Sequence, residues 1–585
     1  MSDETVENTE KKWALKEPTP DLCSKLSQEL NISQIVAQVL INRGIDTPEK
    51  ARRFLSARLQ DLHSPFLMKG MDKAVNRIIS AIKNNEKICI YGDFDVDGIT
   101  ATAVMVLFLR EVNINVSYYI PRRLEEGYGL NVSAVKRIKA RGASLLITVD
   151  CGVSDVKAVK YAHKNSMDVI VTDHHEMPDN FSEAYAILNP KQPDCGFPFK
   201  GLAGVGVAFN LIIGLRKKLR ELGFWQKGQE PNLKDYLDLV ALGTIADIVP
   251  MVDENRIFAK NGLKIIAKGK RPGIKALKDV SGIADGEVDA GMVAFRLAPR
   301  MNASGRLSDA KLVVDLLIST TYEEAYVLAK KIDVENTSRQ KIGRKILAEA
   351  KSKIAAGTAP DGPLVLSDKG WHQGVVGICA SRLSDEFFMP TVLLAINEKT
   401  GEARGSARSI NGFDIYSAIK ECEEDLKAFG GHKAAAGLTL KVDKIDVFKK
   451  KFTEIVRAEL ARRDYIPIVE VDAEISLEML TYGVLQEIEN LAPFGPANPE
   501  PVFSSLDIDY YSTMTVGNGH LKLKIKESGQ FFDAIGFNMA SRYCFKDEKI
   551  RLAFVPQIHA YNGERSIQLN LRDIKYGNME TAVNN

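Results

Sequence analysis

The sequence contains no run of apolar residues long enough to cross a bilayer. Its longest nearly uninterrupted apolar run covers residues 99–109, which is too short for a membrane-spanning helix. The first residues, MSDETVENTEKK, are polar and acidic, whereas a secretory signal begins with basic residues and continues with apolar ones. These absences predict a protein without membrane association and with a cytoplasmic location.

Cysteine pairs and an excess of positive charge are also missing. The seven cysteines are scattered and none forms a Cys-x-x-Cys pair, so we expect neither a disulfide framework nor a zinc ribbon. The 78 basic and 76 acidic residues leave a net charge of only +2. Proteins that coat nucleic acid usually carry a clear basic excess, so any nucleic-acid site here must be a local patch.

Length and apolar content, in contrast, are ample. The chain has 585 residues, 45% of them hydrophobic, which is more than a single core usually serves. Between residues 87 and 247, apolar strands alternate with amphipathic helices. This alternation is typical of a parallel sheet that is covered by helices on both faces.

The remainder of the chain predicts further domains. A helical pattern over residues 322–354 indicates a long strut, and a second α/β region begins near residue 363. Short strands with turn residues follow from about residue 466 and predict a small all-β domain. We therefore expect a polar tail with short helices, a first α/β domain, a helical segment with the connecting helix, a second α/β domain and a β-barrel, at residues 1–75, 76–250, 251–355, 356–460 and 465–577.

Acidic and imidazole side chains stand where the apolar runs of the first α/β domain end. They form four groups along the chain: Asp93, Asp95 and Asp97; Asp150; Asp173, His174 and His175; and Asp247, which follows the apolar run 236–245. The carboxyl ends of parallel strands share one edge of a sheet, where ligands bind in open α/β folds. We therefore expect these side chains to converge on one crevice.

Carboxylates packed so closely repel one another and cannot all stay ionised without a counter-charge. Divalent cations supply that charge, and a set of Asp and His without thiolates suits Mn²⁺ or Mg²⁺. An aspartate between two ions could bridge them. Two ions roughly 4 Å apart can activate a hydroxide and stabilise both oxygens of a displacement at phosphorus.

Other interpretations fit single groups but not the whole set. A lone Asp after a strand is usually a helix cap or a turn residue. Residues 93–98, Asp-x-Asp-x-Asp-Gly, could open a calcium-binding EF-hand loop, but its twelfth position must be Glu and here is Val104. Phosphatases with an aspartyl nucleophile also open on a strand and Asp-x-Asp. That reading leaves Asp173-His174-His175 unexplained and stays a minor alternative.

The four groups, in order, resemble the motifs of DHH-family phosphoesterases: Asp-Phe-Asp-Val-Asp-Gly at 93–98, Val-Asp at 149–150, Asp-His-His at 173–175 and Gly-Thr-Ile-Ala-Asp at 243–247. The resemblance to one branch, the RecJ exonucleases, continues beyond them. It includes residues 300–307, expected as a turn before the connecting helix, and second-lobe motifs at 370–377, 381–382, 405–409, 430–432 and 435–437. The match runs from about residue 70 to about residue 575 and leaves the first residues unplaced.

This resemblance implies an α/β fold, in which a parallel-sheet DHH catalytic lobe is joined by a long helix to a second α/β lobe and followed by a C-terminal OB-fold β-barrel. It implies a metal-dependent exonuclease that releases mononucleotides from single-stranded DNA in the 5′ to 3′ direction, in repair and recombination. Two divalent cations, Mn²⁺ or Mg²⁺, would be held by Asp93, Asp95, Asp97, Asp150, His174 and Asp247. His175 would contact the scissile phosphate, and Asp173 would orient a ligand.

Substrate-binding candidates are the basic, polar and glycine residues of the later motifs: Arg122, Arg300, Asn302, Arg306, Ser381, Arg382, Arg404, Arg408, Gly431 and His432. Arginine offers a planar fork to phosphate oxygens, and Gly430-Gly431 lets a backbone approach closely. Most single arginines are solvated surface charges. We therefore expect an anion site at Gly-Gly-His chiefly because of the resemblance.

The C-terminal region carries aromatic and basic residues whose role the sequence leaves open. Tyr510, Tyr511, Phe531 and Phe532 could stack on unpaired bases or belong to the core. Strand alternation places Lys522 and Lys524 on one solvent face, which is either a DNA-binding edge or an ordinary solvated one.

Two other functions compete with the exonuclease. A DHH phosphodiesterase could act on cyclic dinucleotides or short oligonucleotides, but those relatives lack the strut and the OB-fold. A non-catalytic DNA-binding scaffold would be expected to lose metal ligands, and all of them are present. Single-strand-binding protein and a helicase as partners, and a monomeric state, follow only from family analogy.

Overall fold

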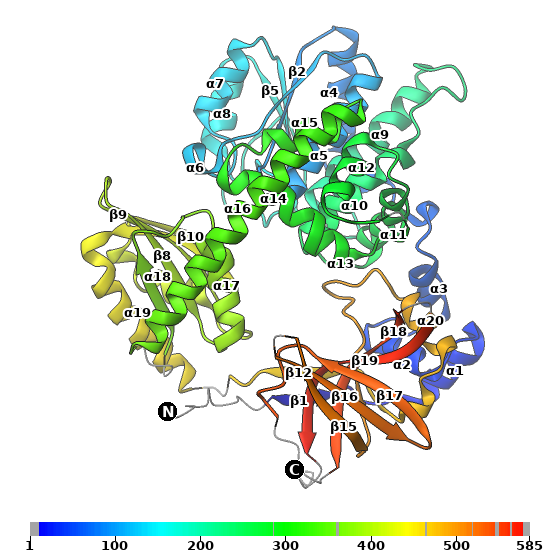
Figure 1. Ribbon diagram of the computed structural model, residues 1–585. Coiled ribbons are helices and arrows are strands. Elements are labelled where there is room, and N and C mark those ends of the chain that lie inside the picture. Colours follow the sequence, from blue (N-terminus) through cyan, green and yellow to red (C-terminus); the bar gives the residue numbers. More distant parts are fainter. Residues whose placement is uncertain are drawn as a thin grey trace. The chain divides into compact units, whose positions relative to one another are not determined.

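The computed structural model describes residues 11–284, 286–357, 362–462, 465–517, 519–543, 549–561 and 564–576. Contacts divide the chain into two compact units. One unit is Leu59–Tyr465 and contains two α/β lobes. The other joins Met1–Arg58 to Ile466–Asn585 and contains a β-barrel (Figure 1).

The first lobe is built on a parallel sheet with the strand order β3-β2-β4-β5-β6. Alternate residues of a strand point to opposite faces, so Ile90 and Ile147 enter one core while Tyr91 and Leu146 enter another. Burial on both faces explains why these strands read as continuous apolar runs. The strands are β2 (Ile88–Gly92), β3 (Val116–Tyr119), β4 (Leu145–Val149), β5 (Asp168–Thr172) and β6 (Ala186–Leu188).

Helices cover both faces of this sheet, as the sequence predicts. α4 (Met71–Lys83), α5 (Val96–Glu111), α9 (Gly204–Glu221) and α10 (Leu237–Ala246) share a core with one face. α7 (Val132–Ala140) and α8 (Val156–Lys164) pack on the other. The predicted parallel α/β lobe is confirmed.

Two expectations about local structure are wrong. The apolar run 236–245 was grouped with the parallel strands, but it forms helix α10. Asp247 is the C-cap residue of this helix and does not follow a strand. Residues 237–245 are all buried, and periodicity alone does not separate a buried strand from a buried helix. Residues 300–307, expected as a turn, lie in helix α14 (Ala298–Leu307), which begins with proline in its first turn.

Helix α16 (Tyr322–Ala355) is the predicted strut between the lobes (Figure 1). Its first half buries Ala329 and Ile332 in the core of the first lobe, and its second half buries Ile346 and Ala350 in the second lobe. None of the described helices is long and apolar enough to cross a membrane. The helices that precede α14 and α16 are α11 (Asp253–Lys268), α12 (Pro272–Val280), α13 (Ala290–Met292) and α15 (Lys311–Ile318).

The second lobe carries a mixed sheet with the order β10-β11-β9-β8-β7, in which only β7 and β8 run parallel. α17 (Val376–Phe387) packs on one face with the end of α16, and α18 (Ile415–Lys420) and α19 (Ile445–Leu460) pack on the other. The predicted second α/β lobe is confirmed. Its strands are β7 (Leu364–Asp368), β8 (Thr391–Asn397), β9 (Glu402–Arg408), β10 (Ala428–His432) and β11 (Ala435–Lys441).

The smaller unit contains the predicted OB-fold barrel. Its sheet has the order β13-β14-β18-β19-β17-β16-β15. An isolated bridge joins Ile508, just before β15, to Ile550, the first residue of β18, and so connects β15 with β18. Strand β15 is mostly exposed and polar, so it lacks the apolar signal from which the short strands of this region were predicted. The strands are β12 (Ile468–Val471), β13 (Ala473–Ile475), β14 (Phe503–Ser505), β15 (Asp509–Val516), β16 (His520–Glu527), β17 (Gln530–Gly536), β18 (Ile550–Tyr561) and β19 (Glu564–Tyr576).

The N-terminal residues, which the sequence left unplaced, belong to this smaller unit up to Arg58. β1 (Lys12–Leu15) pairs in parallel with β12. Apolar residues of α2 (Gln34–Asn42) and α3 (Pro48–Ser56) share one core with the barrel, and α1 (Pro20–Leu30) packs on α2. The domain boundaries expected from the sequence stay predictions.

Candidate metal centre

The aspartates of residues 93–97 lie at the carboxyl end of β2, where the chain turns into α5. Asp95 is the N-cap of α5 and accepts a hydrogen bond of 3.1 Å from the backbone N–H of Gly98. Asp93 and Asp97 are buried. The sequence therefore uses one of the three carboxylates to begin the helix and leaves the others to face the sheet edge.

Asp97 is held by the start of another helix. Its carboxylate accepts hydrogen bonds from the backbone N–H groups of Gly204, at 2.6 Å, and Val205, at 2.8 Å, in the first turn of α9. The positive end of a helix dipole favours an anion at this place. Burial and the neighbouring charge of Asp95 nevertheless raise the pKa of Asp97 to about 7.

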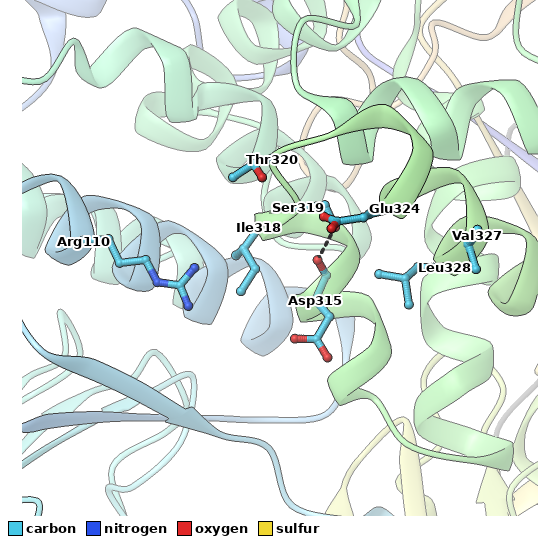
Figure 2. Close-up of a pocket in the computed structure, with 8 residues that line it drawn as sticks. All are labelled: Arg110, Asp315, Ile318, Ser319, Thr320, Glu324, Val327 and Leu328. Atoms are coloured by element: carbon cyan, nitrogen blue, oxygen red, sulfur yellow. Dashed lines mark hydrogen bonds between the residues drawn. The ribbon is translucent and has the colours of Figure 1, made fainter.

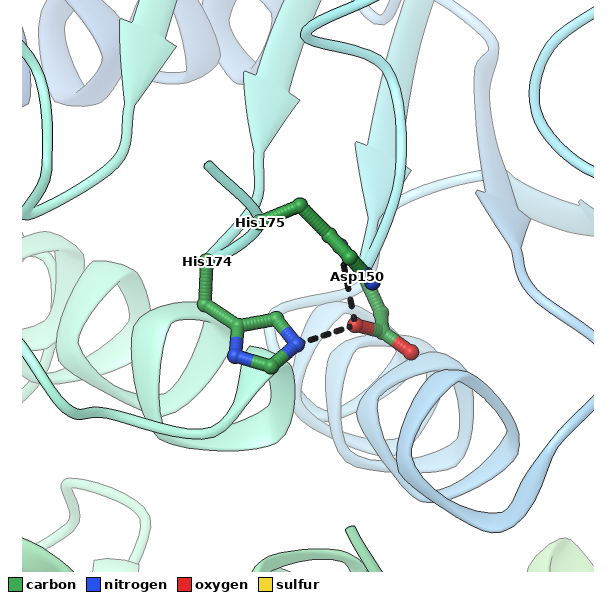
Figure 3. A group of neighbouring side chains, drawn as sticks. All are labelled: Asp150, His174 and His175. Atoms are coloured by element: carbon green, nitrogen blue, oxygen red, sulfur yellow. Dashed lines mark ion pairs between the residues drawn. The ribbon is translucent and has the colours of Figure 1, made fainter. Parts of the chain in front are cut away.

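His174 joins carboxylates that come from separate elements. Its Nε2 lies 3.2 Å from Oδ1 of Asp150, 3.5 Å from Oδ2 of Asp247 and 3.9 Å from Oδ2 of Asp97. Figure 3 shows the ring of His174 directed at the Asp150 carboxylate. Burial and the neighbouring His175 lower the pKa of His174 to about 4, so the ring is neutral near pH 7 and suited to bind a cation.

His175 is oriented by Asp173. Nδ1 of His175 lies 2.7 Å from Oδ1 of Asp173, which also accepts the backbone N–H groups of His174 and His175. Burial would lower the pKa of His175, but the hydrogen bond and charge of Asp173 raise it instead. The hydroxyl of Tyr128 lies 3.2 Å from Nε2 of His175. Asp173 thus contacts the histidines rather than the other carboxylates.

The ligand atoms group into two sets that could each hold a cation. Asp97, His174 and Asp247 form one set, Asp93, Asp95 and Asp150 form another, and atoms within each set lie within 4.8 Å of one another. A third set of the same size combines Asp150 with His174 and His175. Asp150 and His174 therefore each belong to two of the three sets, and Asp150, with two carboxylate oxygens, is the one of this pair that could contact two cations.

Several buried atoms of this centre have no hydrogen-bond partner in the structure: Oδ1 of Asp93, Oδ1 of Asp150, Nε2 of His174 and Oδ2 of Asp247. Burial and the neighbouring carboxylates raise the pKa of Asp93 and Asp150 well above the usual range, and that of Asp247 to about 10. Buried carboxylates of this kind need a counter-charge. Oxygen and imidazole donors without a thiolate fit Mn²⁺ or Mg²⁺.

Two glycines allow helices to approach the centre. A Cβ on Gly204 would stand 2.5 Å from Oδ1 of Asp150, and a Cβ on Gly243 would stand 3.0 Å from Oδ1 of Asp97. Real Cβ atoms do not come this close to polar atoms, so α9 and α10 could not pack in this way with alanine at either place.

Five arginines form a second cluster between the lobes, here called the arginine cluster: Arg123 on α6 (Arg123–Glu126), Arg306 on α14, Arg339 on α16, Arg382 on α17 and Arg408 on β9. Burial and the charges of Arg123, Arg339 and Arg408 lower the pKa of Arg306 to about 10. Burial and the charge of Arg382 lower the pKa of Arg339.

The arginine cluster has few partners of opposite charge. Arg306 donates to the carbonyl of Gly374 at 3.3 Å, and Arg408 donates to Oγ of Ser406 at 2.7 Å. Among the described residues, no acidic side chain forms an ion pair with any of the five. The charge of Asp95, in the metal centre, opposes the lowered pKa of Arg306. Grouped guanidinium ions without acids are suited to bind an anion.

The other substrate-binding candidates are less concentrated. Arg300 donates to Oδ1 of Asp333 at 2.8 Å and to the carbonyl of Arg296, so it ties α14 to α16. Arg122 is exposed and lies 3.3 Å from Glu125. Arg404 is exposed and reaches Gln373 at 3.5 Å. Asn302 and Ser381 are half-buried on α14 and α17.

Gly431 and His432 lie on the exposed edge strand β10. His432 pairs with Ala435, which pairs with Arg408, so His432 and Arg408 occupy one row on the same face of the sheet. The strand register therefore connects the Gly-Gly-His motif with the arginine cluster.

Comparison with known proteins identifies the family. Three family models match in chain order: the DHH family N-terminal domain at residues 87–244, the DHHA1 domain at 361–458 and the RecJ OB domain at 471–573. The single-stranded-DNA-specific exonuclease RecJ of Bacillus subtilis is 40% identical over 96% of this chain and 70% of its own length. This chain belongs to the RecJ family.

Other members of the RecJ family agree with this assignment. The RecJ of Salmonella typhimurium is 38% identical over 93% of this chain and 96% of its own length. Two crystal structures of Thermus thermophilus RecJ are similar in fold, one in complex with Mn²⁺ and one with Mg²⁺. The former has a TM-score of 0.82 at 27% identity, and the latter 0.76 at 26%; they cover 96% of this chain and 79% and 78% of theirs.

Sequence reasoning missed several residues of the site. Arg123 and Arg339 belong to the arginine cluster, and Tyr128 contacts His175. The sequence shows an adjacent Arg-Arg pair at residues 122–123. Only the folded chain shows that Arg123 lies over the ring of Phe94, with its guanidinium carbon 5.0 Å from the ring centroid. Arg339 lies in the strut, and no sequence signal separates it from solvated helix residues.

One cavity of the described structure lies away from the metal centre. Its volume is about 630 Å³, and it is lined by α5, α15 and α16 residues that include Arg110, Asp315 and Glu324 (Figure 2). None of the predicted site residues lines it. The metal centre is thus recognised by its chemistry and not by cavity size.

Proposed function

We propose that this chain is a metal-dependent exonuclease that hydrolyses phosphodiester bonds of single-stranded DNA in the 5′ to 3′ direction and releases 5′-mononucleotides. The observation that carries the proposal is the set of buried Asp and His atoms without hydrogen-bond partners, next to an arginine cluster without acids. Its relatives carry the name single-stranded-DNA-specific exonuclease RecJ. The Asp and His set would hold metal cations, and the arginine cluster carries guanidinium cations. Together they would neutralise the negative charge of a phosphodiester from two sides.

In this proposal Asp93, Asp95, Asp97, Asp150, His174 and Asp247 hold two divalent cations, Mn²⁺ or Mg²⁺. The T. thermophilus relative is known in complex with each of these ions. When bound, the two ions would neutralise charge on the phosphorus oxygens and lower the pKa of water. The α9 N–H groups keep Asp97 in place, and Asp150 lies between the two ligand sets.

His175 serves as a hydrogen-bond donor to the scissile phosphate. Asp173 accepts the Nδ1 proton and raises the pKa of the ring, so that Nε2 can present a proton to an anion. The Tyr128 hydroxyl lies 3.2 Å from that Nε2 and 3.3 Å from Nδ1, so Tyr128 lies beside the ring of His175. Asp173 therefore acts as a positioning residue.

The arginine cluster binds the backbone phosphates of the strand. Arg306 and Arg408 carry this role together with Arg123, because their charges act on one another and no described acidic side chain forms an ion pair with them. His432 and Gly431 extend the same sheet face. Arg122, Asn302, Ser381, Arg382 and Arg404 stay candidates of the same surface, whereas Arg300 is already bound to Asp333.

The barrel supplies a stacking surface for unpaired bases. Tyr511 and Phe531 are 70% and 52% exposed, and their rings meet edge to face with centroids 5.6 Å apart. Lys524 and Lys526 lie over the Phe531 ring at 5.3 and 5.6 Å. Exposed aromatics interleaved with lysines suit single strands, whereas Phe532 is buried and belongs to the core.

Several finer expectations stay predictions. A monomeric state and association with single-strand-binding protein and a helicase rest on family analogy, and a cytoplasmic location rests on the sequence composition. Size-exclusion chromatography with light scattering would test the monomer directly.

The experiment that tests the function uses the wild-type chain, an Asp150→Asn variant and an Asp72→Asn variant as matched control, since Asp72 is exposed on α4. Each is incubated with end-labelled single-stranded and duplex DNA, with Mn²⁺, Mg²⁺ or chelator. We expect metal-dependent release of mononucleotides from the 5′ end of single strands only, absent in Asp150→Asn and unchanged in Asp72→Asn. DNA that is bound but never cut by the wild type would support a scaffold, and cleavage of dinucleotides alone a small-substrate phosphodiesterase.

A further inference from the structure

Ile248, the residue after Asp247, combines two unfavourable features. Its backbone has φ = 59°, in the left-handed region that β-branched side chains avoid. Its apolar side chain is 73% exposed. A helix that ends at this position, as α10 does, ordinarily has Gly or Asn there.

The strain is specific to this place. Among the non-glycine residues of positive φ in the described chain, most are Asn, Asp, Ser or Ala, and Ile248 is the one that branches at Cβ. Asp150, in the same metal centre, also has a positive φ of 62°. Strained backbone of this kind persists where the surroundings hold it, and it concentrates at functional sites.

The surroundings of Ile248 prevent it from relaxing. Val249 and Met251, on its C-terminal side, are buried. The side-chain amide of Asn255 donates to the carbonyls of Pro250, at 3.0 Å, and Gly201, at 2.6 Å, and so ties this turn to the loop before α9. The turn therefore presents an apolar side chain to solvent in a fixed position beside the metal centre.

We propose that Ile248 packs against the nucleobase of the nucleotide at the end being cleaved. This inference rests on the proposed function. Consecutive Cα atoms are about 3.8 Å apart, and Asp247 Oδ2 lies 3.5 Å from His174 Nε2. Ile248 thus lies one residue from a proposed metal ligand, within the length of a nucleotide that is bound there through its phosphate. An aliphatic side chain contacts the face of any base, which suits an enzyme that must accept all four.

The test compares the wild type with Ile248→Asn and Ile248→Leu. Asn tolerates the left-handed backbone, so Ile248→Asn keeps the fold and its Tm does not fall. Substrates are single strands that end either in a normal nucleotide or in an abasic one. For the normal end we expect kcat/KM of Ile248→Asn to fall roughly tenfold, as for a lost apolar contact of one side chain, and Ile248→Leu to keep most of it.

The abasic end decides whether the base is the partner. On that substrate we expect the wild type and Ile248→Asn to be equal, because the contact is absent from both. Fluorescence anisotropy of the same oligonucleotides in chelator gives a binding readout that does not depend on activity. The matched control is Val334→Asn, which removes a similarly exposed aliphatic side chain from α16 and should leave both substrates unaffected.

Two results would overturn the inference while the proposed function stands. One is an Ile248→Asn variant with wild-type rates on both substrates. The other is an equal loss on normal and abasic ends, which would mean that the base is not what Ile248 contacts. A wild type that degrades no single strand would instead refute the proposed function itself.

Discussion

The metal centre and the arginine cluster are opposite in charge and also opposite in the way they are built. Four short motifs of the first lobe supply the carboxylates and imidazoles, and backbone N–H groups hold several of them. The arginines come from α6, α14, α16, α17 and β9, which span both lobes of the larger unit. The metal centre is thus assembled within the first lobe, whereas the arginine cluster combines residues of both lobes and of helix α16.

This difference separates two functions within one site. The carboxylates are largely buried, so they repel one another strongly. A bound cation relieves this repulsion, and the site therefore favours a cation. The arginines form no ion pair with a described acidic side chain and donate to neutral groups such as the Gly374 carbonyl and the Ser406 hydroxyl, so their charges are left to bind an anion. Variants that affect one cluster and leave the other intact test this division.

The largest effect is expected for a direct ligand. Asp97→Asn removes a charge that two α9 N–H groups hold in place. We expect kcat/KM to fall by more than the roughly 100-fold that loss of a ligand-orienting residue costs, while DNA binding in chelator is kept. Steady-state kinetics at several Mn²⁺ concentrations and calorimetric Mn²⁺ titration measure both. Retained affinity for Mn²⁺ with two ions bound would contradict the assignment.

A second prediction concerns the stability of the metal-free protein. The pKa of Asp97 is raised to about 7 in the folded state, while an unfolded Asp titrates near 4. The folded state therefore holds the proton more tightly, and its stability falls as pH rises from about 4 through about 7. Denaturant unfolding in chelator at pH 5, 6 and 7 should show this decline, and Mn²⁺ should reverse it. A flat profile in chelator would contradict it; Asp97→Asn should weaken the slope.

Loss of an arginine should have a smaller effect, confined to substrate binding. We expect Arg306→Met to raise KM roughly tenfold and to reduce the slope of log KM against log salt concentration by about 1, as for one lost phosphate contact. Mn²⁺ affinity should not change. The control is Arg300→Met, which breaks the pair with Asp333 and should lower Tm without changing the salt slope. Equal salt slopes for Arg306→Met and the wild type would remove Arg306 from the strand path.

The smallest effect is expected on the barrel. Tyr511→Ala with Phe531→Ala removes two exposed rings, and a stacked base is worth about 1–3 kcal/mol. We expect weaker binding and lower processivity on long strands, but unchanged kcat/KM on short oligonucleotides. Electrophoresis of partial digests of both substrates, with Ser512→Ala as a control on β15, separates these outcomes. Equal losses on short and long substrates would place the defect elsewhere.

Much of the fold could be predicted from the sequence. Helix α16 matches its predicted range, 322–354, to within one residue, and the parallel strands β2, β4 and β5 with helices α5 and α8 lie in the region 87–247 where alternation was predicted, because the apolar patterns of these stretches are strong. α10 could not be predicted as a helix, because a completely buried run has no polar face to show its period. The exposed strand β15 was missed for the opposite reason, since it buries little and its apolar signal is weak.

Spacing by itself indicated which residues of the first lobe carry the chemistry, because an Asp or His after a strand reaches the sheet edge whatever the rest of the fold does. Tertiary structure alone decided that Asp247 arrives from a helix end, that Arg123 rather than Arg122 belongs to the arginine cluster, and that Ile248 is held exposed and strained. Those facts depend on how separate elements pack, and no local pattern encodes the distance between residues that lie far apart in the chain.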